Sequence, residues 1–303
     1  MIKHNWKKVS MIAFSLVALT LVGCGNSNKN KSDTKPKSAN ATYGEQMNYK
    51  ITGIDAGAGV VQASEKAIKD YKLDYTVQTS SGAAMTQALS DAIKNKEPIV
   101  LTGWSPHWMF SKYDLKYLKD PKGSFGGSEH INTIARLKLK EDKPDAYKIL
   151  NQFSWTPKDM EAVMLKINDG EDVKKTARQW ITDNKDKVGK WTAGAKKVKG
   201  EEIKLAYVAW DTEIASTNLI ALVLEDMGYK VRLTQVESGP MWAAVASGDV
   251  DAIVAAWLPG THAKYMADYK GKFEDLGPNL EGAKIGLVVP KYMNIDSIED
   301  LVK

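Results

Sequence analysis

Tryptophan is the residue type whose number and placement in this sequence indicate binding chemistry. The 303 residues include nine tryptophans, among them those of the segments Trp104-Ser105-Pro106 and Trp257-Leu258-Pro259. The face of an indole ring attracts cations, and a desolvated contact of this kind contributes about 2 kcal/mol or more. Because the ring requires no hydrogen-bond donor on the cation, a group of indoles favours a quaternary ammonium ion.

A glycine-rich turn at residues 55–59 offers the complementary chemistry. It precedes a predicted helix over about residues 60–71, so the amide groups of Gly59 and Val60 lie at the start of that helix. Such amides have no partner inside the helix, and they point outward at the positive end of the helix dipole. A carboxylate fits there without a charged side chain. Amides on one side and indole faces on the other describe a zwitterion with a methylated nitrogen.

The elements that must position these groups occur in the same order twice. Each copy reads strand, helix, strand, helix, strand, which predicts parallel sheets with right-handed crossovers and hence two α/β lobes. The first copy has strands over 49–54, 75–79 and 99–102, with helices over 60–71 and up to 91. The second has strands over 203–208, 230–235 and 252–256, with helices over 215–227 and up to 246. Between them, helical patterns over 146–153, 157–168 and 173–186 predict additional helices.

The segments that begin at Trp104 and Trp257 each follow the last strand of one copy, which indicates where they lie. Ligands of open α/β sheets bind beyond the carboxyl ends of the strands. A single tryptophan is more often a core residue than a ligand contact. Two at equivalent places in two repeats favour a cleft between the lobes, with Trp104 and Trp257 facing it.

The N-terminus predicts a lipoprotein signal. Three lysines precede an apolar run of about fifteen residues, 9–23, which is shorter than the roughly 20 that span a bilayer. The run ends at Leu-Val-Gly before Cys24, the single cysteine of the chain. We therefore expect a signal peptide over 1–23, a lipidated Cys24, and a polar flexible tether over 24–45. The alternative for Cys24 is a free buried thiol.

Charge and motifs exclude several classes of function. The net charge of +5 comes from residues 1–45, and the remainder carries 35 basic and 35 acidic residues. A neutral body lacks the footprint of a nucleic-acid-binding protein. Beyond the signal peptide the chain has three histidines and no HExxH, GxSxG or phosphate-binding GxxxxGK motif. We expect no enzymatic activity, no cofactor and no metal.

Three segments of the chain resemble a known family, the glycine betaine-binding lipoproteins of osmoregulated ABC importers of Gram-positive bacteria. They are Thr102-Gly103-Trp104-Ser105-Pro106-His107-Trp108, the stretch from Tyr207 through Trp210-Asp211-Thr212-Glu213 to Asn218, and Ala256-Trp257-Leu258-Pro259-Gly260-Thr261-His262. The resemblance runs from about Lys50 to the C-terminus. It implies a two-lobe clamshell of the type II periplasmic-binding-protein class, with the ligand in the cleft.

The resemblance also implies roles for individual residues. Three tryptophans form a prism around the trimethylammonium group, and the matching positions are Trp104, Trp210 and Trp257. The carboxylate is held by two amides and one histidine, which match Gly59, Val60 and His262. Without the resemblance, His262 would be interpreted as a surface residue capping a loop. Trp108 and Trp242 are expected to be packing residues.

The family further implies two crossings between the lobes, which we place near 133–137 and near 286–290. Lobe one would then comprise 46–135 and 288–303, and lobe two 136–287. We expect a monomer on the outer face of the cytoplasmic membrane, with an ABC permease as its partner. The sequence does not choose between glycine betaine, proline betaine and carnitine. Sensing without transport and an enzyme acting on a betaine stay open as alternative functions.

Overall fold

The computed structural model describes residues 41–302, so the predicted signal peptide, Cys24 and most of the predicted tether lie outside the described residues. Helix α1 (Tyr43–Gln46) begins the described chain. Thr42 and Glu45 form a capping box at its start, which satisfies two amides that the helix itself leaves free. The last residues of the expected tether are therefore helical.

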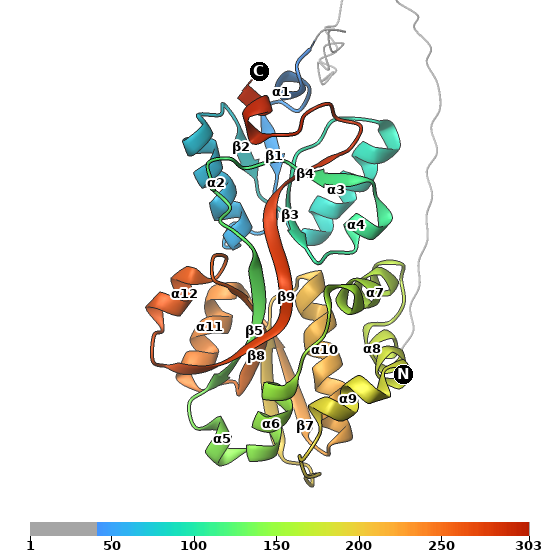
Figure 1. The fold of residues 1–303 in the computed structure, drawn as a ribbon, viewed down its shortest axis with the longest axis vertical. Coiled ribbons are helices and arrows are strands. Elements are labelled where there is room, and N and C mark those ends of the chain that lie inside the picture. Colours follow the sequence, from blue (N-terminus) through green and yellow to red (C-terminus); the bar gives the residue numbers. More distant parts are fainter. Residues whose placement is uncertain (1–40, 303) are drawn as a thin grey trace, which may run out of the picture. The chain divides into compact units, whose positions relative to one another are not determined.

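Lobe one is built from parallel strands and the helices that connect them (Figure 1). Strands β2 and β3 both pair with β1 in parallel, and β4 pairs with β9 (Phe273–Pro290). The elements are β1 (Lys50–Thr52), α2 (Gly59–Tyr71), β2 (Thr76–Gln78), α3 (Gly82–Asn95), β3 (Leu101–Ser105), α4 (Met109–Lys112), β4 (Leu115–Tyr117) and η1 (Ile298–Val302).

Lobe two repeats the arrangement with β6, β7 and β8, where β7 and β8 both pair with β6 in parallel. Its elements are α5 (Leu139–Asp142), α6 (Pro144–Gln152), α7 (Pro157–Asn168), α8 (Val173–Asp183), α9 (Lys185–Trp191), β6 (Glu202–Tyr207), α10 (Asp211–Asp226), β7 (Lys230–Gln235), α11 (Ser238–Ser247), β8 (Ala252–Leu258) and α12 (Ala263–Asp268). With β5 (Glu129–Arg136) included, the strand order across the protein is β2-β1-β3-β9-β5-β8-β6-β7. The predicted two-lobe α/β fold of type II is thus confirmed.

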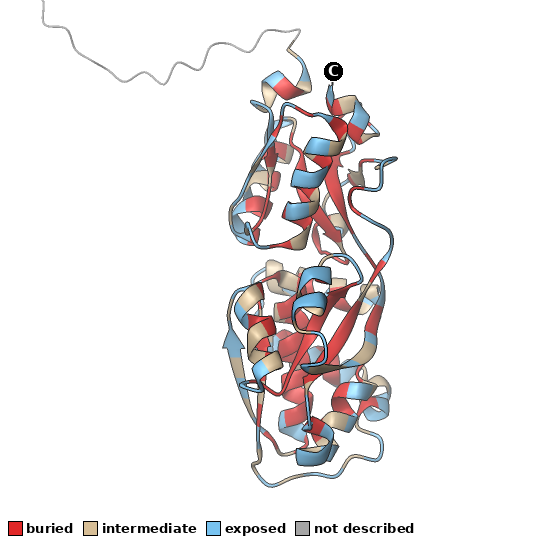
Figure 2. Cartoon of the chain, turned by 90° about the vertical axis from the view of Figure 1, so that its left-hand side faces the viewer, coloured by how far each residue is buried: buried red, intermediate tan, exposed pale blue. Residues whose placement is uncertain are grey.

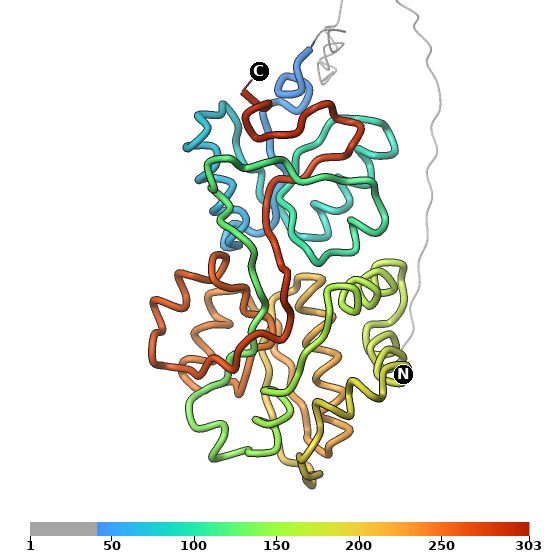
Figure 3. Tube along the Cα trace, in the orientation of Figure 1, coloured from blue at the N-terminus to red at the C-terminus, as the bar shows by residue number. Residues whose placement is uncertain are grey.

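Strands β5 (Glu129–Arg136) and β9 (Phe273–Pro290) run between the lobes (Figures 1 and 3). Strand β9 pairs with β5 up to Ala283 and with β3 from Lys284 onward. Residues 133–137 and 286–290, where we expected the crossings, lie at or within strands paired inside one lobe. The change of lobe comes earlier on each segment, near Glu129 on β5 and between Ala283 and Lys284 on β9. Strand β9 continues through both sheets without a break, so its sequence does not reveal the crossing.

Two tryptophans predicted in loops lie instead in strands. Trp104 pairs with Ile285 of β9, and Trp257 pairs with Ile131 of β5. Antiparallel pairing with β9 and β5 extends β3 and β8 past the tryptophans. Helix α10 likewise begins at Asp211, four residues before the predicted start, because the segment interpreted as a turn forms its first helical turn.

The additional helices of lobe two cover one side of α10. Twelve of its sixteen residues are buried, since β6 and β8 lie on one side of it and α7 and α8 on the other. Three tryptophans pack among these helices, with Trp180 and Trp191 stacked at 5.7 Å and Trp155 edge-on to Trp180 at 6.0 Å. Figure 2 shows the buried strands inside each lobe and exposed outer faces on the helices. These three tryptophans therefore belong to the apolar core of lobe two.

Candidate functional site

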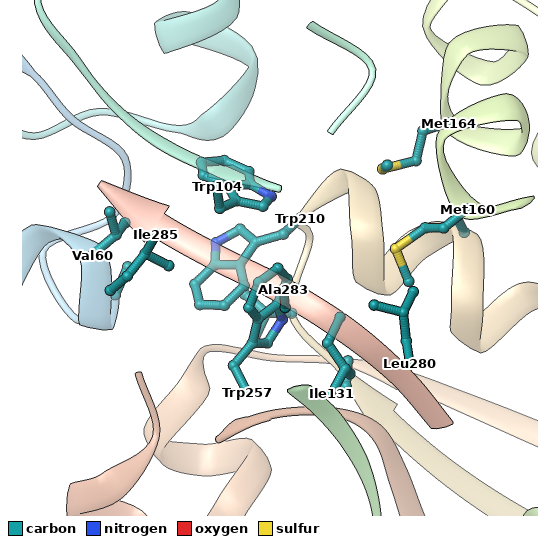
Figure 4. Close-up of a cluster of buried hydrophobic side chains, with 14 of the residues drawn as sticks. Val60, Trp104, Ile131, Met160, Met164, Trp210, Trp257, Leu280, Ala283 and Ile285 are labelled. Carbon is teal, nitrogen blue, oxygen red and sulfur yellow. The ribbon is translucent and has the colours of Figure 1, made fainter. Parts of the chain in front are cut away.

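Three tryptophans from three elements line one cavity between the lobes (Figure 4). Trp104 comes from the end of β3 in lobe one, Trp257 from the end of β8, and Trp210 from the N-cap position of α10. The cavity is partly open to solvent, and the space among its lining residues together with the solvent at its mouth is about 290 Å³. Its other lining residues are Ile54, Ala58, Gly59, Val60, Thr261 and Ile285.

The cavity wall is apolar, and its tryptophans are almost fully buried. The exposed fractions are 5% for Trp104, 7% for Trp210 and 3% for Trp257. Within the described part of the chain, its lining residues include no acidic or basic side chain. A wall of this kind solvates a cation through ring faces, and it strengthens those contacts because it excludes water.

Two free amides lie on the lobe-one side of the cavity, at the start of α2. The N-cap residue Ala58 offers no side-chain cap, and its carbonyl accepts the amides of Val61 and Gln62. The amides of Gly59 and Val60 have no acceptor among the described residues. They retain the capacity to bind an anion at the positive end of a thirteen-residue helix.

The glycine at position 59 is required by the approach of the other lobe. A Cβ atom there would lie 2.5 Å from the carbonyl oxygen and 2.8 Å from the Cα of Thr261. These are backbone atoms of lobe two, and they cannot be displaced by a side-chain rotation. A side chain on residue 59 would therefore separate the lobes at the cavity.

His262 lies behind the cavity wall, 1% exposed, and does not line the cavity. Its ring stacks on the Trp210 ring at a centroid distance of 6.3 Å, and Trp242 packs edge-on against it at 5.5 Å. Burial lowers the pKa of His262 to about 3, so the ring is neutral. Its Nδ1 accepts the Trp257 amide at 3.0 Å, which leaves the proton on Nε2. Nε2 has no partner among the described residues.

Two polar contacts join the lobes beside the cavity, and our sequence analysis did not predict them. The indole Nε1 of Trp210 donates to Asp55 Oδ2 at 2.9 Å, and His107 lies 3.2 Å from Asp211 Oδ2. Asp55 lies in the glycine-rich turn and Asp211 directly after Trp210. Both were present in segments already singled out, but no pattern within one segment indicates its partner in the other lobe.

The cavity residues Ile54, Thr261 and Ile285 were also not predicted. Thr261 belongs to the third resemblance segment, whereas the two isoleucines follow ordinary strand patterns. Trp108 and Trp242 are buried and do not line the cavity.

Within residues 41–302, no cluster of three or more His, Cys, Asp or Glu side chains is suited to a metal ion. None of the helices described in that range has the length and apolar character needed to cross a membrane.

Glu213 is a fully buried acid in the first turn of α10. Its Oε2 accepts the Val208 amide at 2.5 Å, while Oε1 has no partner among the described residues. Burial raises the pKa of Glu213 to about 8, and the Val208 hydrogen bond opposes that rise. The side chain is therefore neutral at pH 7, and it fixes the loop before Trp210 to the helix.

Comparison with known proteins places this cavity in context. The family model described as the substrate-binding domain of ABC-type glycine betaine transport systems matches residues 29–183 and 201–303. A glycine betaine/carnitine transport binding protein, GbuC of Listeria monocytogenes, is 56% identical over 299 residues, covering 97% of this chain and 98% of that protein.

Solved structures of similar proteins align over part of the chain. The lactococcal OpuAC, in its closed conformation with glycine betaine, is 56% identical with a TM-score of 0.47, covering 48% of this chain and 58% of that one. A glycine betaine/L-proline-binding protein from Borrelia burgdorferi is 37% identical with a TM-score of 0.47, covering 50% and 58%. A phosphate-binding protein from Streptococcus pneumoniae is 13% identical with a TM-score of 0.45, covering 84% and 93%.

The buried acid generates a prediction about pH. The pKa of Glu213 is raised from 4.5 to about 8 on folding, so the unfolded chain loses this proton first. The stability that Glu213 contributes is complete below about pH 4.5 and is lost as the pH rises toward 8. Between pH 6.5 and 8 we expect wild-type stability to fall and that of Glu213→Gln to fall less, since the titration of His262 near pH 6.5 in the unfolded chain is common to both proteins. Urea unfolding at each pH measures this.

Glu225→Gln serves as the control, because Glu225 is an exposed acid on the same helix. It should reproduce the wild-type slope. A wild-type slope retained by Glu213→Gln would show that Glu213 is ionised in the folded protein.

Proposed function

The chain belongs to the substrate-binding domains of ABC-type glycine betaine transport systems, and we propose that it captures glycine betaine or carnitine outside the cell and delivers it to a membrane importer, for osmoprotection. The family is one of binding proteins, so the role is not enzymatic. The observation that best supports this solute class is the cavity itself, with three buried indoles and two free amides on opposing walls.

Each end of such a solute has a counterpart in the cavity. The trimethylammonium group offers no hydrogen-bond donor, and we propose that the faces of Trp104, Trp210 and Trp257 hold it. A bare ammonium ion would lose its water hydrogen bonds in the same apolar surroundings and gain none in return. The carboxylate would accept the Gly59 and Val60 amides, whose charge-assisted hydrogen bonds contribute about 1.5–3 kcal/mol each.

The proposed third contact of the carboxylate is His262. Its neutral ring carries the proton on Nε2, and a buried donor without a partner costs about 1–3 kcal/mol. A carboxylate within reach of Nε2 would remove that cost. Because the ring lies behind the wall, this contact needs a small adjustment of Trp210 or of the loop at Thr261 when the ligand binds.

We further propose that the two lobes move relative to each other about the crossing segments, which are β5 near Glu129 and β9 near Ala283 and Lys284. The two proposed ends of the site are divided between the lobes. Trp104 and the amide pair belong to lobe one, and Trp210, Trp257 and His262 belong to lobe two. Binding would therefore stabilise the form in which the lobes meet, and the importer would distinguish it from the open form.

Titration calorimetry of the full-length chain, purified in detergent, tests the two ends separately. Choline keeps the trimethylammonium group and lacks the carboxylate, so it should bind at least about tenfold more weakly than glycine betaine. Glycine keeps the acid and has a strongly hydrated ammonium group, so it should bind more weakly still. Trp104→Ala, Trp210→Ala and Trp257→Ala should each weaken glycine betaine binding by about 1–3 kcal/mol.

Equal affinity for choline and glycine betaine would exclude the amides and His262 as the carboxylate site. Equal affinity for glycine would exclude the tryptophan box. Carnitine and proline betaine, titrated in the same series, decide which betaine is preferred.

Gly59→Ala tests whether close contact between the lobes at Gly59 and Thr261 is needed for ligand binding. The added Cβ meets the Thr261 backbone and should weaken glycine betaine binding at least about tenfold, because overlap of this kind typically costs 1–3 kcal/mol. The melting temperature of the free protein should not fall, since Gly59 is the first residue of α2 and its φ is not positive, so alanine adopts the same backbone.

Gly82→Ala is the matched control, because Gly82 also begins a helix of lobe one and a Cβ there meets nothing within 4 Å. It should bind as the wild type does. Unchanged affinity in Gly59→Ala would show that the close contact with Thr261 is not needed for binding.

We also propose that lipid on Cys24 holds the protein at the outer face of a Gram-positive cytoplasmic membrane. The support is the sequence pattern of residues 1–24. Cys24→Ala should release the protein into the medium while leaving its affinity for glycine betaine unchanged, because about 35 residues separate Cys24 from Gly59. Fractionation of cells, followed by calorimetry on the released protein, measures both. A variant that stays in the membrane fraction would show that another segment is the anchor.

A further inference from the structure

One of the three indoles of the cavity has an acidic partner in the other lobe. The Nε1 of Trp210, in lobe two, donates to Asp55 Oδ2, in lobe one, at 2.9 Å. An indole nitrogen can only donate, and a hydrogen bond to a carboxylate is charge-assisted. Trp257 differs, because its Nε1 is buried and has no partner among the described residues.

A second contact between the lobes holds the neighbouring residue. His107 Nδ1 accepts the Met109 amide at 3.2 Å, so Nε2 carries the proton and donates to Asp211 Oδ2. Trp210 and Asp211 are consecutive at the start of α10, and each is attached to a different segment of lobe one. The Trp210 ring is thereby fixed at its nitrogen edge and at its backbone, with the neutral His262 ring stacked on one face.

The carboxylate changes what the Trp210 ring offers to a cation. The attraction between a cation and an indole is electrostatic and depends on the negative charge of the ring face. Donation of the N–H to an anion moves electron density into the ring, and the anion itself adds negative charge at the ring edge. The cavity wall is apolar, so this charge is less screened than it would be in water.

The turn that carries Asp55 also carries the proposed anion site, and it keeps the two apart. The backbone carbonyl of Asp55 accepts the Ala58 amide at 2.9 Å, while its side chain is bonded to Trp210. The Gly59 and Val60 amides stay free at the start of α2. One short turn therefore supplies negative charge to an indole and positive amide ends to the cavity.

From these contacts we propose that Asp55 is a specificity-determining residue, which strengthens the cation-binding face of Trp210 once the lobes have met. This inference rests on the proposed binding of a quaternary ammonium solute. It adds that full recognition of the cation requires both lobes, because the indole and the carboxylate that polarises it come from opposite sides of the cleft.

A double-mutant cycle tests the proposal by calorimetry with glycine betaine and the full-length chain in detergent, at one pH and salt concentration. Asp55→Asn keeps the shape and an acceptor oxygen but removes the charge. We expect it to weaken binding about fivefold, a change of about 1 kcal/mol. Trp210→Phe keeps an aromatic face and removes the donor, and in that background Asp55→Asn should change affinity less than twofold.

Asp74→Asn is the matched control, since Asp74 is an exposed acid of lobe one. It should leave affinity unchanged. Indole signals in a proton–nitrogen correlation spectrum of the liganded protein provide an independent readout. The Trp210 signal, assigned by its loss in Trp210→Phe, should shift upfield in Asp55→Asn and stay in place in Asp74→Asn.

Equal losses from Asp55→Asn in both backgrounds would overturn the proposal, as would unchanged or tighter binding by Asp55→Asn alone. Tighter binding would mean that Asp55 repels the ligand carboxylate more than it assists the cation. If the wild type binds none of the betaines, the proposed function fails and this inference with it. If the wild type binds and the cycle is additive, only the role of Asp55 fails.

Discussion

Strand β9 belongs to the sheets of both lobes, and the cavity depends on that continuity. The strand pairs with β5 through Ala283 and with β3 from Lys284, so its backbone passes beside the site without interruption. Ile285 pairs with Trp104 and also lines the cavity. Because the strand is fixed by hydrogen bonds on both sides of the crossing, the ends of β3 and β8 are presented to the same space.

The polar groups around the cavity fall into two sets with different physical roles. Some are satisfied within one lobe, as the carboxylate of Glu129 is by the Gly260 and Thr261 amides and the Thr261 hydroxyl. Others have no partner among the described residues, and they include the two amides of α2 and Nε2 of His262. The first set fixes the shape of the loop after β8, and the second retains binding capacity toward an anion.

The contacts between the lobes include the Lys112–Asp169 ion pair and three others at or beside the cavity. These three are the Gly59–Thr261 approach, the Trp210–Asp55 hydrogen bond and the His107–Asp211 pair. Each places a group of one lobe against a group of the other that also shapes the site. The cavity wall is therefore complete only when both lobes contribute to it.

The sequence by itself determined the repeated α/β order, the two tryptophans at the strand ends and the amide pair at the start of α2, because each of these depends on local periodicity or helix geometry. The three segments that resemble the family added Trp210 and His262 to the predicted site. Only the tertiary structure decided that Trp104 and Trp257 lie within strands, that His262 lies behind the wall, and that Asp55 contacts Trp210. Those features depend on pairing and contact between segments far apart in the chain, for which no local pattern carries a signal.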